Sequence, residues 1–162
     1  MSTASSPRAR LATLAVFAFA MGWLEAVVVV YIRGLIGLGP GAGIPPVDEV
    51  LRRFRALPWL LGTEQTREVA TLVMLGAVAL LAADRLRSRL GAFLVAFGVW
   101  DIAYYVALYV FLRWPQSLMS YDVLFLIPPG PWWHQPVWVP IAISAVMIGF
   151  GARLFVAGPK RG

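Results

Sequence analysis

Four long apolar runs dominate the chain, and short polar segments separate them. The runs cover residues 11–32, 64–83, 91–112 and 136–157. At about 1.5 Å per helical residue, the first run would form a helix roughly 33 Å long. This exceeds the hydrocarbon core of a bilayer, which is about 30 Å thick. We therefore expect an all-α integral membrane protein with four transmembrane helices over these runs.

Two shorter segments have patterns of their own. In residues 47–57, Val47, Val50 and Phe54 recur at helical spacing while charged residues take the other side. This pattern predicts a short amphipathic helix lying at the membrane interface. Residues 118–127 are apolar but too few to cross a bilayer, so we expect a re-entrant or surface segment there.

The ends of the chain are polar. Residues 1–10 are rich in serine and predict a disordered lead, and residues 158–162 predict a short tail. Residues 11–157 would then form a single four-helix membrane domain. A basic lead before an apolar run is also typical of a signal peptide, but the run continues well beyond Ala20, which favours an uncleaved span.

The composition supports lipid as the main solvent. Hydrophobic residues make up 60% of the chain and charged residues only 14%, whereas soluble domains carry about 25% charged residues. The net charge is +6, but the basic residues lie at the ends of the apolar runs rather than along one face. That distribution indicates membrane topology and does not favour a nucleic-acid partner.

The positions of lysine and arginine predict the orientation. Eight of the 14 basic residues lie at the amino end, in the second turn and at the carboxyl end: Arg8, Arg10, Arg85, Arg87, Arg89, Arg153, Lys160 and Arg161. Cytoplasmic segments carry the excess of lysine and arginine. We therefore expect both termini in the cytoplasm, in a bacterial-type inner membrane or a plasma membrane.

Residue types limit the cofactors. The chain has no cysteine, which excludes disulfides and iron–sulfur clusters held by its own thiolates. It has one histidine, His134, so it cannot alone supply both ligands of a bis-histidine haem. These residue types do not exclude a divalent cation as a cofactor.

Two carboxylic acids interrupt the apolar runs, Glu25 in the first and Asp101 in the third. A charge at the centre of a transmembrane helix costs about 2.5–3.5 kcal/mol on insertion scales, so such groups are functional candidates. We assign Asp101 and Glu25 as candidate catalytic residues. Polar residues expected at a similar depth are candidate ligand-binding residues: Glu64, Arg67, Glu68, Tyr104, Tyr105, Asp122 and His134.

These residues predict an acidic pocket in the outer half of the bilayer. It would bind a cation-bearing or amphiphilic, lipid-like ligand, and whether it also performs acid/base catalysis is left open. If a divalent metal is held, its expected ligands are Glu25, Glu68, Asp101 and His134.

Structural roles explain the same residues as well. Glu25 and Asp101 could be hydrogen-bonded acids between helices or partners of Arg67. Glu64 and Glu68 suit the start of a helix, where carboxylates complement its dipole. His134 lies beside tryptophans, as an interfacial histidine would.

Two further classes of function compete with the pocket. The chain could be a non-catalytic accessory or assembly subunit of a larger membrane complex, since it is small and its loops are short. It could also form a homo-oligomeric proton or cation pathway, although the inner halves of the spans offer few polar residues. The chain carries none of Gly-x-Ser-x-Gly, His-Glu-x-x-His or a P-loop, so the sequence does not decide whether it is an enzyme.

Overall fold

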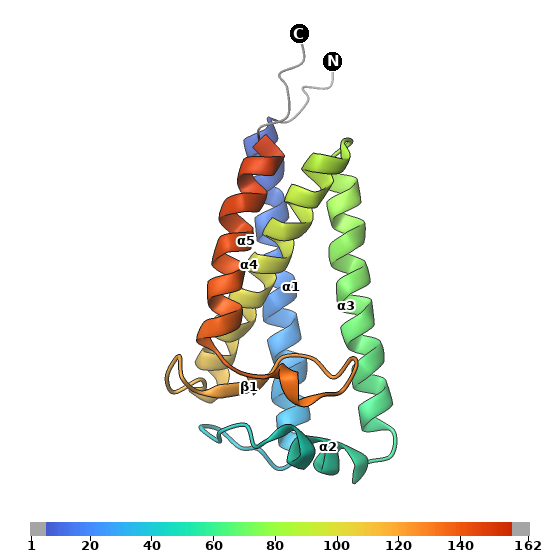
Figure 1. The fold of residues 1–162 in the computed structure, drawn as a ribbon, viewed down its shortest axis with the longest axis vertical. Coiled ribbons are helices and arrows are strands. Elements are labelled where there is room, and N and C mark those ends of the chain that lie inside the picture. The colour runs from blue at the N-terminus through green and yellow to red at the C-terminus, as the bar shows by residue number, and fades with distance from the viewer. Residues whose placement is uncertain (1–5, 157–162) are drawn as a thin grey trace.

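The computed structural model describes residues 6–156. Four of its helices are long and apolar enough to cross a membrane by length and composition. They are α1 (Pro7–Leu35), α3 (Leu60–Ala82), α4 (Leu86–Leu112) and α5 (Trp138–Val156). They run along one long axis as a bundle, and the start of α1 and the end of α5 lie at the same end (Figure 1). The predicted tail and the first five residues lie outside the described residues.

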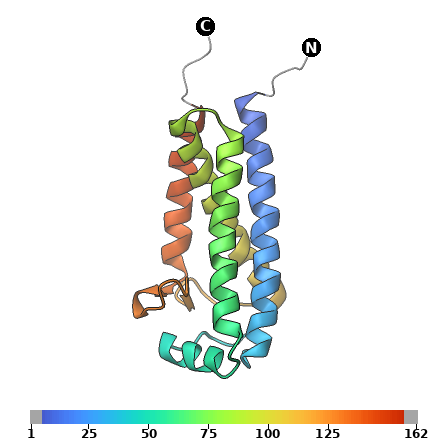
Figure 2. The same cartoon turned by 90° about the vertical axis from the view of Figure 1, so that its right-hand side faces the viewer.

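The remaining elements gather at the opposite end of the bundle. They are α2 (Val47–Arg55), β1 (Tyr121–Val123), the 3₁₀ turn η1 (Pro131–Trp133) and β2 (His134–Pro136). Figures 1 and 2 show α2 lying across this end, with the β1 and η1 segments beside it. These segments cover the space between the long helices at that end.

Three of the long helices, α1, α3 and α4, begin earlier than the apolar runs indicated. The Ser6 hydroxyl accepts the amide N–H of Ala9 at 3.2 Å and Pro7 takes the first helical position, so α1 includes residues 7–10 that we expected to be disordered. The α3 helix begins at Leu60. Thr63 lies within this helix, where its hydroxyl donates to the Trp59 carbonyl at 2.8 Å. The α4 helix begins at Leu86, within the basic turn.

The expectation of a purely helical fold is wrong in one detail. The β1 strand lies within the apolar segment 118–127 and pairs antiparallel with β2, so that Tyr121 faces Pro136 and Val123 faces His134. Because this pairing uses the backbone of β2, α5 begins at Trp138 rather than at Pro136. Strands of three residues are too short to show an alternating pattern in the sequence.

The α2 helix is amphipathic as expected, but its apolar side is covered by protein. Val47, Val50 and Phe54 are buried, while Glu49 pairs with Arg52 and Arg53 on the other side. The apolar cluster around α2 contains Ile32, Ile36, Leu38, Leu60 and Leu126. Hydrophobic burial thus fixes α2 against the ends of α1 and α3.

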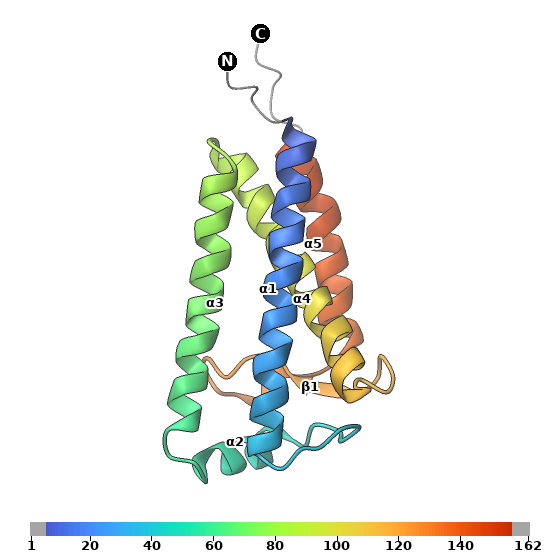
Figure 3. The same ribbon diagram turned by 180° about the vertical axis from the view of Figure 1, so that it is seen from behind.

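The packing of the bundle is uneven. The α4 helix approaches α5 closely at Gly98, where an added Cβ would lie 2.6 Å from the Ser144 carbonyl oxygen, and again at Gly91 and Gly151. Small residues allow such close helix contacts. The α3 helix meets α4 near their connecting turn, and the two diverge toward the α2 end (Figures 1 and 3). Residues of α1, α3, α4 and α5 line a cavity at that end.

We predict that Gly98→Ala lowers the free energy of unfolding by about 1–3 kcal/mol, the usual cost of overpacking. The new methyl group would push α4 from α5 at Ser144. Unfolding in mixed detergent micelles, followed by helical circular dichroism, measures the change. Gly149→Ala is the matched control, because nothing lies within 4 Å of an added Cβ there. Equal stability of the two variants would contradict the close α4–α5 contact.

Candidate functional site

A cavity of about 260 Å³ lies between the diverging helices at the α2 end. Its wall carries five carboxyl groups and two guanidinium groups, and the rest is largely apolar or aromatic. The charged residues are Glu25, Glu64, Glu68, Asp101 and Asp122, with Arg33 and Arg67. All five carboxyl-bearing residues are buried. The predicted acidic residues thus meet in one cavity.

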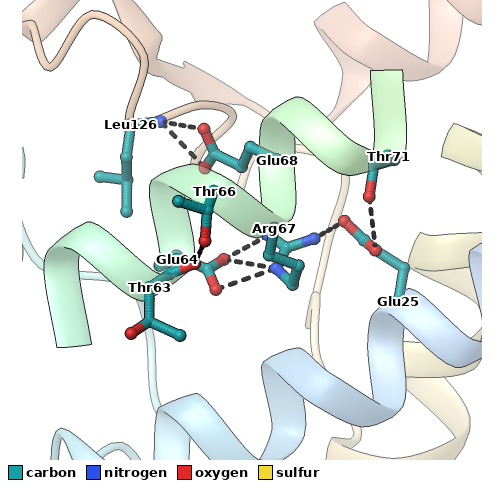
Figure 4. Close-up of polar contacts among 8 residues, drawn as sticks. All are labelled: Glu25, Thr63, Glu64, Thr66, Arg67, Glu68, Thr71 and Leu126. Atoms are coloured by element: carbon teal, nitrogen blue, oxygen red, sulfur yellow. Dashed lines mark hydrogen bonds and ion pairs between the residues drawn. The ribbon is translucent and has the colours of Figure 1, made fainter. Parts of the chain in front are cut away.

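Arg67 on α3 holds two of these carboxylates (Figure 4). Its Nε donates to both Glu64 oxygens at 2.9 Å, and its terminal nitrogens pair with Glu64 and with Glu25 on α1. The Thr71 hydroxyl donates to the second Glu25 oxygen at 3.2 Å. One guanidinium is therefore shared by two carboxylates, and the group ties α1 to α3.

Glu68 on α3 binds the backbone of the loop that follows β1. Both of its oxygens accept the Leu126 amide N–H at 3.0 Å (Figure 4), and Gln65 donates to the Leu126 carbonyl at 3.0 Å. These side chains stand three residues apart and so share a face of α3. Together they anchor the loop between β1 and η1 over the cavity.

Asp101 joins α4 to α5. The Ser144 hydroxyl donates to Asp101 Oδ2 at 2.8 Å, and the close approach of the two helices at Gly98 brings Ser144 there. One turn further along α4, Tyr104 lines the same cavity and stacks on Trp100 with ring centroids 6.4 Å apart. A carboxylate can accept more hydrogen bonds than the one that Asp101 receives.

Asp122 on β1 completes the acidic set. The Tyr105 hydroxyl donates to its Oδ2 at 3.1 Å, and the Val123 amide donates to its Oδ1 at 2.9 Å. Burial raises the pKa of Asp122 above its ordinary value, although the positive charge of Arg33 and the Tyr105 hydrogen bond oppose this. Asp122 thus adds a carboxyl group to the cavity wall beside the paired strands β1 and β2, here called the β1–β2 hairpin.

Two predicted ligand-binding residues do not line the cavity. Tyr105 touches it only through its hydrogen bond to Asp122. His134 packs its ring against Tyr121 at a centroid distance of 4.8 Å. Within residues 6–156, no three histidine or acidic side chains gather in a way that could hold a metal ion. The metal set of Glu25, Glu68, Asp101 and His134 is therefore not assembled.

The structure adds three polar residues that we did not predict, Arg33, Thr71 and Ser144. Thr71 follows Glu68 by three residues and so shares its helix face, and Ser144 is the one hydroxyl in the last apolar run. Both signals were present in the sequence. Arg33 stands at the end of the first run, where a basic residue is ordinary, so its burial carried no such signal.

Comparison with protein-family models, with curated proteins and with solved structures finds no match for this chain. The chemistry of the cavity therefore follows from its own residues.

We predict that Arg67→Met lowers the free energy of unfolding by about 3–5 kcal/mol, because it leaves two buried carboxylates without a counter-charge. Adding Glu25→Gln should recover part of this loss, since one of the orphaned charges is then gone. Denaturant unfolding of both single variants and the double variant gives the coupling energy. Strictly additive losses would contradict the ion pair between α1 and α3.

We predict that Asp122 makes stability depend on pH. Its folded-state pKa is raised, so its contribution is present below the unfolded pKa of about 3.9 and is lost as pH rises through the folded pKa. Asp122→Asn removes this dependence. The melting temperature of the variant, relative to the unmodified chain, should therefore rise with pH. A difference that stays constant across the pH series would contradict the burial of this carboxyl.

Proposed function

We propose that this chain is a multi-pass membrane protein whose cavity binds an amphiphilic ligand bearing a cationic group. The observation that carries the proposal is the convergence of five carboxyl groups and only two guanidinium groups on a largely apolar cavity. A buried excess of acid is costly unless the groups are neutralised by protons or by a cation. A cationic group on the ligand would provide a counter-charge beside these carboxyls.

Asp101 is the principal cation contact in this proposal. Arg67 already pairs with Glu25 and Glu64, whereas among residues 6–156 Asp101 receives only the Ser144 hydroxyl. An acid or base role in catalysis would also fall to Asp101 rather than to Glu25, because Arg67 and Thr71 hold the Glu25 carboxylate. Glu25 then serves mainly to join the helices.

The apolar wall supports a ligand with a hydrocarbon chain. It includes Val29, Phe97, Trp100, Phe125, Trp133 and Ile143. Ile143 on α5 is 54% exposed, so the cavity wall reaches the outer surface of the bundle there. Apolar burial contributes about 0.8 kcal/mol per CH₂ group. An alkyl chain lying against this wall from the surrounding lipid would therefore add affinity to the charged contact.

The distribution of lysine and arginine supports cytoplasmic termini, which would put the cavity in the outer half of the membrane. The α2 helix and the β1–β2 hairpin would then lie at the outer interface and separate the cavity from water. The charged side of α2, with Glu49 and Arg52, would face the interface.

A continuous proton or cation pathway through one chain is less well supported. Between the cavity and the ends of the described chain, the buried core is apolar and contains Leu14, Ala18, Met21, Leu75, Ala79, Ala92 and Ala96. A role as a purely structural accessory subunit leaves the acidic excess without a use. The binding proposal accounts both for the excess of carboxyl groups in the cavity and for the apolar core beyond it.

We predict that Asp101→Asn weakens binding of dodecyltrimethylammonium about tenfold or more, in line with loss of one buried charge–charge contact. Binding is measured by titration calorimetry in dodecyl maltoside micelles. Asp48→Asn is the matched control, since it makes the same change at an exposed carboxylate on α2. Unchanged affinity in a folded Asp101→Asn protein would contradict the proposed contact, as would equal weakening by Asp48→Asn.

A further inference from the structure

Arg33 is a buried cation with one side-chain nitrogen that has no hydrogen-bond partner in the described part of the chain. It lines the cavity from α1 and is 3% exposed. Its Nη2 is buried and has no hydrogen-bond partner among residues 6–156. A buried donor left without an acceptor costs about 1–3 kcal/mol, and more when it is charged. An acceptor that the described chain does not supply would remove this cost.

The surroundings of Arg33 hold its guanidinium in place by stacking. The guanidinium carbon lies 3.7 Å from the ring centroid of Trp114, which is itself 1% exposed. Stacking on an aromatic ring leaves the edge of the guanidinium free for hydrogen bonds. Asp122 is close enough to feel the charge of Arg33, but its oxygens accept hydrogen bonds from Tyr105 and Val123.

A second unused donor belongs to the same cavity wall. Trp100 lines the cavity, is 7% exposed, and its indole Nε1 is buried without a partner among the described residues. Indole N–H groups are donors only and usually find an acceptor when buried. Two donors without acceptors in an otherwise acidic cavity indicate that its ligand is not a simple cation.

We propose that Arg33 forms an anion subsite in this cavity, and that the ligand is zwitterionic, with an oxyanion for Arg33 and an ammonium group for Asp101. This inference rests on the proposed function and specifies its ligand class. A phosphate or carboxylate fits the planar guanidinium, which can donate two parallel hydrogen bonds to either group. The apolar wall favours an amphiphile, such as a zwitterionic lipid, over a soluble phosphorylated amine of the same headgroup chemistry.

The test compares three probes that share parts of one structure. Dodecylphosphocholine carries both charges and a chain, dodecyltrimethylammonium lacks the phosphate, and phosphocholine lacks the chain. Titration of the full chain in dodecyl maltoside micelles should give about tenfold tighter binding of dodecylphosphocholine than of dodecyltrimethylammonium, the size expected of one charge-assisted pair. Phosphocholine should bind more weakly than either. If phosphocholine bound as tightly as dodecylphosphocholine, the hydrocarbon chain would add no affinity. That result would contradict an amphiphilic ligand but would leave the anion subsite at Arg33 in place.

Variants locate the subsite. Arg33→Gln should remove the preference for dodecylphosphocholine, because the phosphate contact is lost. It should not weaken binding of dodecyltrimethylammonium, which has no phosphate and is repelled by the guanidinium of Arg33. Arg33→Lys, which keeps the charge but not the planar fork, should retain part of the preference. Arg113→Gln, at an exposed arginine after α4, is the control and should change neither affinity.

The outcomes separate the two proposals. Equal affinities of the unmodified chain for the two dodecyl probes would overturn the anion subsite, and this comparison needs no variant to fold. Equal weakening of both probes by Arg33→Gln would also overturn it. In both cases the proposed function stands, because dodecyltrimethylammonium still binds. Failure of both dodecyl probes to bind the unmodified chain would overturn the proposed function itself.

Discussion

The pairing of Arg67 with Glu25 and Glu64 determines how α3 sits against the rest of the bundle. Carboxylates removed from water need a counter-charge or hydrogen-bond donors, and this guanidinium provides the counter-charge across α1 and α3. The contact matters because α3 diverges from α4 toward the α2 end (Figure 3). It fixes the distance between helices there and so the width of the cavity.

The other acidic groups close the cavity in the same way, each through one contact between elements. Glu68 fixes the loop at Leu126, Asp101 fixes α5 through Ser144, and Asp122 fixes the hairpin through Tyr105. Each carboxyl therefore has a structural role, yet the hydrogen bonds account for only part of the buried charge. Among the described residues, Arg33 has a donor nitrogen without a partner and Asp101 accepts one hydrogen bond, from Ser144. The proposed ligand would pair with both.

The sequence predicted the four long helices, because apolar runs of this length have few alternatives. It also predicted that Glu25, Asp101 and Arg67 lie at a similar depth in the membrane, because depth follows from the rise per residue along each helix. It misplaced the start of α3, because Leu60 to Gly62 carry no cap signal. The β1–β2 pairing and the position of His134 depend on contacts between distant segments. The unused donor of Arg33 depends on which side chains fill the neighbouring space, which spacing along the chain does not encode.

The central claim is that carboxyl groups from separate helices face one cavity, and the absence of native cysteine makes it directly testable. Glu25→Cys combined with Thr71→Cys should react in membranes with a short thiol-specific cross-linker, because the two native side chains are hydrogen-bonded. Glu25→Cys with Val73→Cys, on the exposed side of α3, is the control. Cross-linking of the first pair alone is the predicted result. Equal cross-linking of both pairs, or of neither, would contradict the packing of α3 against α1 and with it the cavity.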